Sequence, residues 1–289
     1  MGPPVGAHRD LLPAVQRVLG DRYTVEREVA HGAAARIFAA RDAAGRAVAL
    51  KVLRPELAVS ITAERFLREI DLLSHLDHPR ICRLLDYGER EYLVYYVMPF
   101  IEGPTLREFL DRVRRASVEA TLRETCEVLD ALGYAHRLGV VHRDVKPENI
   151  KLSPTGAVLM DFGIAKAVAA SALSRERLTR SGFTLGTSAY MSPEQVAGEK
   201  EADPRSDLYA LGCVLFECLT GEPPFAHQDD RVVLGMHLRA GVPDVRKLRP
   251  HVPAPLAGVI KKALAKNPAG RWQSAQEMRA ALGECGPPA

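Results

Sequence analysis

The chain has 289 residues, of which 47% are hydrophobic and 26% are charged, and its formal net charge is +3. This is the composition of a folded globular protein, which excludes a largely disordered chain. The charges are nearly balanced, so no strongly basic surface is expected and nucleic acid is not expected as a partner.

Targeting signals and metal-binding cysteines are also missing from the sequence pattern. The longest apolar runs, at residues 92–101 and 208–219, are shorter than the ~18–20 residues of a membrane helix. The first residues carry no signal-peptide pattern. The five cysteines, at positions 82, 126, 213, 218 and 285, include no CxxC pair. We therefore predict reduced thiols rather than a zinc site, and a cytoplasmic chain without a membrane segment.

The first predicted element is a helix over residues 10–19, which Asp10 can cap and Gly20 can end. Its apolar residues recur at helical spacing: Leu11, Leu12, Val15, Val18 and Leu19. After this helix the pattern changes to short segments rich in β-branched and aromatic residues, at 23–29, 36–41 and 48–53. Such segments, separated by turn residues, predict a meander of strands.

A second helix is predicted around Phe66, Ile70 and Leu73, which recur at i, i+4 and i+7. Two more strands are expected at 81–87 and 92–98. From residue 105 onward helical patterns dominate, with helices predicted at about 105–114, 117–138, 206–219, 229–240, 254–265 and 274–283.

These elements predict an α+β protein with a small, antiparallel, β-rich N-lobe that carries one main helix, and a larger, mostly helical C-lobe. The predicted boundaries are an N-terminal extension at 1–21, the N-lobe at 22–98, a hinge at 99–104, the C-lobe at 105–283 and a loose tail at 284–289. A cleft between two such lobes is a common place for a ligand.

The most informative segment is the octapeptide HRDVKPEN at residues 142–149, inside a long stretch with few helical signals. It groups a carboxylate (Asp144), a cation (Lys146) and an amide (Asn149). Phosphoryl transfer needs these groups: a base for a hydroxyl, a cation for the migrating charge and an oxygen ligand for magnesium. Taken alone, the segment could be a charged surface turn.

Two further segments carry candidate chemistry. The tripeptide DFG at 161–163 follows a predicted strand at 157–160, so Asp161 could reach into a cleft and hold Mg²⁺; alone, it could be an ordinary turn. Lys51 ends the segment VALK in an apolar strand, where a charge is costly unless it is paired. Glu69, on the next helix, could pair with it, whereas an edge-strand Lys51 could instead extend into solvent.

In this order the segments resemble those of eukaryotic-like protein kinases found in bacteria. The resemblance extends to SPE at 192–194, GT at 186–187, DLY at 207–209, and Arg271, which stands where the family pairs an arginine with the residue equivalent to Glu194. The motifs span residues 22–280. The resemblance implies the two-lobed protein-kinase fold, and the lysine two residues after Asp144 resembles the serine/threonine branch.

The resemblance also implies a role for each matched residue. Asp144 would be the catalytic base and Lys146 would contact the γ-phosphate, with the Thr187 hydroxyl bonded to both. Lys51 would hold the α- and β-phosphates of ATP and pair with Glu69. Magnesium, or manganese in its place, would be held by Asn149 and Asp161.

The nucleotide-binding segments depart from the family pattern. The family's glycine-rich loop reads GxGxxGxV, whereas residues 30–37 read AHGAAARI and retain only Gly32. We expect a stiffer loop and weaker ATP binding, without loss of activity. Pro99 at the hinge lacks an N–H but keeps the carbonyl that adenine needs. The implied ATP-binding residues are Ala30, Gly32, Ile37, Ala49, Lys51, Glu69, Met98, Pro99, Ile101, Glu102 and Lys151.

Regulation and partners follow from the same resemblance. Arg143 precedes the base, which in relatives goes with activation by phosphorylation of the loop before Thr187. The candidate acceptors are Thr179, Ser181 and Thr184. The expected partners are proteins with Ser or Thr acceptors, and a transient homodimer for autophosphorylation is a further hypothesis.

We therefore predict a serine/threonine protein kinase that uses Mg-ATP and phosphorylates proteins, its own activation loop included. One alternative is a pseudokinase scaffold, which the altered glycine-rich loop favours and the intact Lys51, Asp144 and Asp161 oppose. Nucleotide binding without turnover would identify it. The other alternative is a kinase of sugars or antibiotics, opposed by the segments at 186–187 and 192–194, which seat a peptide in the family.

Overall fold

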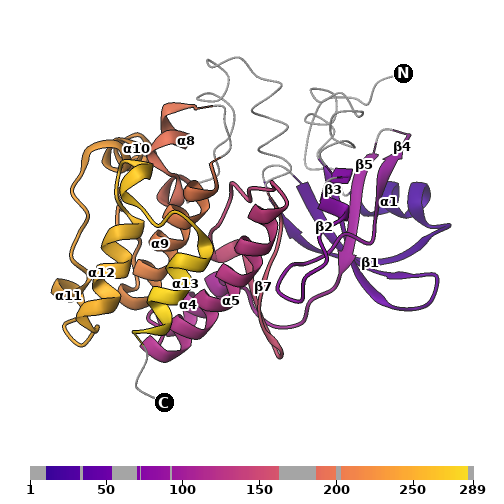
Figure 1. Ribbon diagram of the computed structural model, residues 1–289. Helices are drawn as coiled ribbons and strands as arrows, with labels where there is room; N and C mark the ends of the chain where they lie inside the picture. The colour runs from indigo at the N-terminus through magenta and orange to yellow at the C-terminus, as the bar shows by residue number, and fades with distance from the viewer. Residues whose placement is uncertain are drawn as a thin grey trace. The chain divides into compact units, whose positions relative to one another are not determined.

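The computed structural model describes residues 11–32, 35–53, 70–71, 73–91, 93–162, 187–199 and 203–285. The chain divides into two compact units, which Figure 1 displays together. The first consists of Met1–Ser74 and Arg83–Phe100, and the second of His75–Cys82 and Ile101–Ala289. The change of unit after Phe100 falls within the predicted hinge, and the α+β class is confirmed.

The first unit is built on a five-stranded antiparallel sheet with strand order β1-β2-β3-β5-β4. Its strands are β1 (Tyr23–His31), β2 (Ala35–Asp42), β3 (Ala47–Leu53), β4 (Asp86–Arg90) and β5 (Leu93–Pro99). The helix α1 (Leu12–Leu19) packs on the sheet through a buried cluster that includes Val15, Leu19, Phe38, Leu50 and Tyr95. Asp10, the predicted cap, lies outside the described residues.

One prediction about the segment before β4 is wrong. The strand predicted at 81–87 begins only at Asp86. Residues 75–82, which fall within the range predicted for the N-lobe, group with the second unit. The cause is a tertiary contact, because the N–H of Cys82 donates to the carbonyl of Leu159 at 2.9 Å and the N–H of Leu159 donates to the carbonyl of Arg80 at 2.8 Å. Most of the helix predicted around Phe66 lies outside the described residues.

The second unit is mostly helical. Its helices are α4 (Leu106–Val113), α5 (Val118–Arg137), α8 (Pro193–Ala197), α9 (Pro204–Thr220), α10 (Asp230–Arg239), α11 (Val245–Leu248), α12 (Ala254–Ala263) and α13 (Ala275–Gly283). The six predicted helices are confirmed to within two residues at each end. The reason is local: α5 and α13 are capped by Ser117 and Ser274, and α9 ends at Gly221, whose positive φ suits glycine.

Helix α9 forms the centre of this unit, and its residues from Ser206 to Thr220 are buried. Burial raises the pKa of the Cys213 and Cys218 thiols above their ordinary range, so both stay protonated and unreactive at neutral pH. A two-stranded hairpin, β6 (Ile150–Ser153) and β7 (Gly156–Leu159), follows the octapeptide. Within the described part of the chain, no helix has the length and apolarity needed to cross a bilayer.

Candidate active site

The octapeptide at 142–149 forms a loop that ends in the short helical turn Pro147–Asn149. The Lys146 ammonium lies 3.1 Å from Oδ2 of Asp144. The side-chain amide of Asn149 donates to the backbone carbonyl of Asp144 at 2.8 Å and to its Oδ2 at 3.1 Å. The structure therefore brings the three predicted residues of this loop together, with the carboxylate oriented by two donors.

A buried carboxylate, Asp207 in the first turn of α9, holds the start of this loop. Its two oxygens accept the backbone N–H groups of His142 and Arg143, each at 2.8 Å, and Oδ2 also accepts from His136 Nε2 at 2.8 Å. Arg143 has a φ of +64°, a backbone conformation that is strained for a residue with a side chain. The bonds to Asp207 hold this strained backbone in place.

The imidazole of His142 connects the loop to the strand end at β7. Its Nδ1 accepts from the N–H of Asp144 at 3.2 Å, and its Nε2 donates to the carbonyl of Met160 at 2.8 Å. Burial lowers the pKa of His142, which is consistent with this neutral tautomer. The ring also contacts Phe162, with 4.6 Å between ring centroids. His142 is thus a positioning residue, because both nitrogens hold backbone groups.

Asp161 and Asn149 are tied to each other through the backbone. Asp161 directly follows Met160, whose N–H donates to the Asn149 carbonyl at 2.8 Å. The amide nitrogen of Asn149 is turned toward Asp144, which directs the opposite atom, an oxygen, away from that residue. One amide oxygen and one carboxylate are the ligand types that Mg²⁺ prefers, so these residues fit the predicted magnesium site.

One face of the sheet carries four of the predicted nucleotide-binding residues of the first unit: Ile37, Ala49, Lys51 and Met98. Ile37 pairs with Lys51, which pairs with Tyr96, and Ala49 pairs with Met98. Directly paired residues lie on the same face, and residues two apart along a strand do as well. The α1 cluster uses the alternate residues of these strands and so covers the other face. The Lys51 ammonium lies 5.5 Å from the centre of the Tyr96 ring.

The described part of the altered glycine-rich loop does not require glycine. Ala30 pairs with Ile37 at the end of β1, and the N–H of Gly32 donates to the Ala35 carbonyl at 2.9 Å. Gly32 is not among the glycines with positive φ, and a Cβ built there would lie 3.6 Å from that same oxygen, an ordinary contact. An alanine-rich sequence is therefore compatible with the backbone at the entrance to this loop.

The remaining predicted ATP-binding residues lie at the change of unit and on β6. Pro99 ends β5 opposite Val48, and so lies on the sheet face opposite to Met98. Glu102, in the second unit with Ile101, is exposed. Lys151 lies on β6 and is half-buried.

Helix α8 begins at the predicted SPE segment and contacts the catalytic loop. Ser192 caps the helix, and its backbone N–H donates to Gln195 Oε1 at 3.0 Å. The amide nitrogen of Gln195 then donates to the carbonyl of Arg143 at 2.9 Å. The segment expected to seat a peptide is therefore joined by one side chain to Arg143, the residue before Asp144.

The predicted pair of Glu194 and Arg271 is confirmed. The two residues form a two-pronged ion pair with both N–O distances at 2.7 Å, and Arg271 is only 1% exposed. Ser206 Oγ donates to the same carboxylate at 2.5 Å. The buried pair joins α8 to the segment before α13.

Some predicted residues cannot be placed, and the roles of two residues were not predicted. Glu69, Thr179, Ser181 and Thr184 lie outside the described residues, as does the side chain of Thr187. The anchoring roles of Asp207 and Gln195 were not foreseen. Asp207 carried a usable signal, because it is a carboxylate directly before the apolar run at 208–216 and a buried charge requires partners.

We expect Asp207→Asn to lower kcat about 10-fold to 100-fold with little change in the KM for ATP. The asparagine side chain would turn its N–H₂ group toward His136 or one of the backbone N–H groups of His142 and Arg143. One buried donor would then lose its acceptor, at a cost of about 1–3 kcal/mol. Steady-state kinetics would measure both constants. Asp111→Asn, at a carboxylate that is 64% exposed on α4, is the matched control. An unchanged kcat in Asp207→Asn would contradict the anchoring role.

Comparison with known proteins identifies a family that this chain matches. Residues 23–281 match the family of the protein kinase domain. A probable serine/threonine-protein kinase of Streptomyces coelicolor is 40% identical over 277 residues, which cover 93% of this chain and 40% of that relative. Serine/threonine-protein kinase PknB of Mycobacterium tuberculosis is 41% identical over 271 residues, covering 91% of this chain and 43% of PknB.

A solved structure shares the fold. The crystal structure of Rad53 residues 1–466 in complex with AMP-PNP matches with a TM-score of 0.75 at 24% identity, covering 90% of this chain and 65% of that chain. This likeness concerns the fold alone. The present chain spans less than half the length of the two bacterial relatives it matches.

Proposed function

This chain belongs to the protein kinase domain family, in the branch of bacterial serine/threonine kinases, and we propose that it transfers the γ-phosphate of Mg-ATP to Ser and Thr hydroxyls of proteins. The observation that carries the proposal is the cluster of Asp144, Lys146 and Asn149, in which a lysine and an amide orient one carboxylate. A substrate hydroxyl needs such a carboxylate to accept its proton, and the γ-phosphate needs a nearby cation.

Each residue of the site would have a separate role in the transfer. Asp144 accepts the hydroxyl proton, and Lys146, held against it, offers its charge to the migrating phosphoryl group. Lys51 binds the α- and β-phosphates from the sheet of the first unit. Asn149 and Asp161 hold magnesium, which when bound neutralises charge on the phosphates.

Self-phosphorylation is a further part of the proposal. Arg143 adjoins the base, and its guanidinium could pair with a phosphate on the segment that contains Thr179, Ser181 and Thr184. A transient homodimer would bring that segment of one copy to the active site of another. Gln195, which donates to the Arg143 carbonyl, joins α8 to the loop that contains Asp144.

The test is phosphate incorporation. The purified chain is incubated with Mg-ATP and a generic basic protein, next to Lys51→Met, and the phosphorylated residues are mapped by mass spectrometry. We expect phosphoserine and phosphothreonine in both proteins, and at least a 100-fold loss in the variant because the phosphates lose their positioning cation. Nucleotide binding without any transfer would instead favour the scaffold function, and phosphotyrosine as the main product would contradict the proposed specificity.

A further inference from the structure

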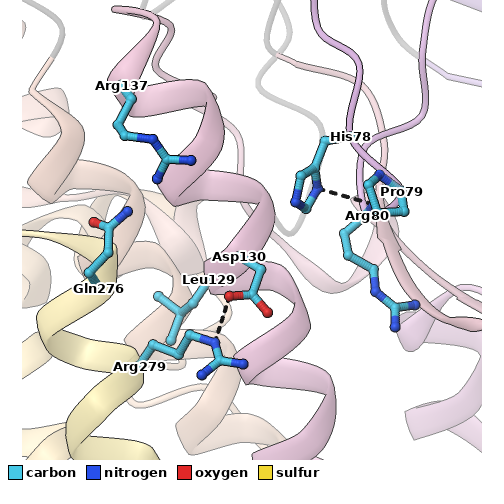
Figure 2. Close-up of a pocket in the computed structure, with 8 residues that line it drawn as sticks. All are labelled: His78, Pro79, Arg80, Leu129, Asp130, Arg137, Gln276 and Arg279. Carbon is cyan, nitrogen blue, oxygen red and sulfur yellow. Dashed lines mark hydrogen bonds and ion pairs between the residues drawn. The ribbon is translucent and has the colours of Figure 1, made fainter.

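A pocket of about 300 Å³ lies in the second unit, where α5, α13 and the segment before β4 meet. Figure 2 shows the side chains that line it: His78, Pro79, Arg80, Leu129, Asp130, Arg137, Gln276 and Arg279. None of them belongs to the catalytic loop at 142–149. The volume is at the small end of the ~300–1,000 Å³ of small-molecule sites, enough for one charged side chain rather than a large cofactor.

The walls of the pocket carry more positive than negative charge. The lining includes three arginines and a single carboxylate, Asp130, which is paired with Arg279 at 2.6 Å. Arg80 is paired with Glu127 at 2.7 Å. Arg137 is exposed, and its guanidinium has no hydrogen bond or ion pair with any described residue. Its charge is therefore the uncompensated one, and an anion is the ligand that this pocket would take.

The neutral side chains of the pocket also present donors. The Nδ1 of His78 accepts from the backbone N–H of Arg80 at 3.2 Å, so the neutral ring carries its proton on Nε2. The ring is held by stacking on Tyr134, with 5.1 Å between centroids. The Gln276 amide has no partner among the described residues, and it lies against α5 because residue 133 is glycine; a Cβ there would come within 2.6 Å of its nitrogen.

We propose that this pocket binds the phosphate group of a phosphorylated Ser or Thr side chain on a protein. Donors on Arg137, Arg279, Gln276 and His78, from three different segments of the chain, line the pocket. A phosphate monoester has three terminal oxygens for such a set, whereas a carboxylate has only two. Guanidinium groups can bind phosphate with two parallel hydrogen bonds. The proposal rests on the proposed function, because a serine/threonine kinase produces this ligand.

The electrostatics at His78 agree with the geometry. Burial lowers the pKa of His78 below its ordinary value, Asp130 partly opposes this, and the charges of Arg137 and Arg80 lower it further. A bound dianion would favour the imidazolium and so raise this pKa. Arg137→Gln would also raise it without any ligand, because one of the opposing cations is removed.

The test uses the whole chain, treated with a phosphatase and without ATP, so its outcome does not depend on catalysis. A synthetic phosphoserine peptide, the same peptide unphosphorylated, and inorganic phosphate are titrated by calorimetry, while NMR follows the His78 ring. We expect binding of the phosphopeptide, much weaker binding of the other two, and a rise in the pKa of His78. Arg137→Gln should weaken binding about tenfold, the loss of one charge-assisted hydrogen bond.

Two further variants complete the design. Gln276→Ala, at an exposed position, should weaken phosphopeptide binding about threefold to tenfold through the loss of one donor. Arg123→Gln, at a 63% exposed arginine elsewhere on α5, should leave binding unchanged. Equal binding of the phosphorylated and unphosphorylated peptides, or unchanged affinity in both pocket variants, would overturn the proposal. If inorganic phosphate bound as tightly as the phosphopeptide, the proposal that the phosphate comes from a phosphorylated protein would be overturned.

Discussion

Asp144→Asn is expected to lower kcat about 10²–10⁴-fold, the range attributed to a general base. The amide cannot accept the hydroxyl proton. It also has only one oxygen to offer to the Lys146 ammonium and the Asn149 amide, both of which now contact Oδ2 of Asp144 at 3.1 Å. The bond from Asn149 to the backbone carbonyl of residue 144 remains, so the loop should keep its conformation.

The measurement is steady-state transfer to a protein substrate at saturating Mg-ATP. The KM for ATP should change little, because the role proposed for the Asp144 side chain is to accept the proton of the hydroxyl, without contact to the nucleotide. Asp111→Asn, on exposed helix surface, should keep the full kcat. A residual kcat within about tenfold of the parent would mean that another group takes the proton, since a general base contributes ~10²–10⁴-fold.

Glu194→Gln is expected to reduce the free energy of unfolding by about 3–5 kcal/mol, the usual cost of breaking a buried ion pair. The variant leaves the Arg271 guanidinium, which is 1% exposed, without its countercharge. The guanidinium cannot turn to solvent, because it also donates to the carbonyls of Ala265, Arg205 and Lys266. Urea unfolding followed by circular dichroism would measure the change.

The control is an exposed ion pair of similar length. Glu26 and Arg41 lie 2.8 Å apart with 42% and 55% of their side chains exposed, so Glu26→Gln should cost at most about 1 kcal/mol. Similar losses at the two sites would contradict the role assigned to burial. In a double-mutant cycle, Glu194→Gln combined with Arg271→Met should be less destabilised than the sum of the single variants.

The effect of Glu194→Gln should also depend on pH. Burial opposes ionisation of Glu194, but hydrogen bonds from Arg271 and Ser206 outweigh it and hold the pKa of this carboxyl below its usual range. The unfolded chain therefore takes up the proton first as pH falls, and native stability drops. The difference in the free energy of unfolding between parent and variant should be largest at neutral pH. It should decrease below about pH 4.3, the pKa of Glu in an unfolded chain.

Some parts of the site could be predicted from the sequence alone, and others could not. The grouping of Asp144, Lys146 and Asn149 could be predicted because the three residues are close in sequence and their chemical types suit one reaction. Strand alternation predicts which residues within one strand share a face. That Ile37, Ala49, Lys51 and Met98 share a face across strands depends on the register of β2, β3 and β5, which only the structure establishes. Asp207 could not be matched with the loop at 142–149 from spacing, because it lies more than sixty residues away.

The sequence by itself determined the α+β class, the six long helices and the family. Helix ends depend on local caps such as Ser117 and Gly221, and the motifs at 142–149, 161–163 and 192–194 are short enough to be read directly. Only the tertiary structure decided that residues 75–82 join the second unit, that Asp207 holds the catalytic loop, and that three arginines from separate segments line one pocket. The physical reason is that buried hydrogen bonds and ion pairs join residues far apart in the chain, and such pairings leave no periodic pattern along it.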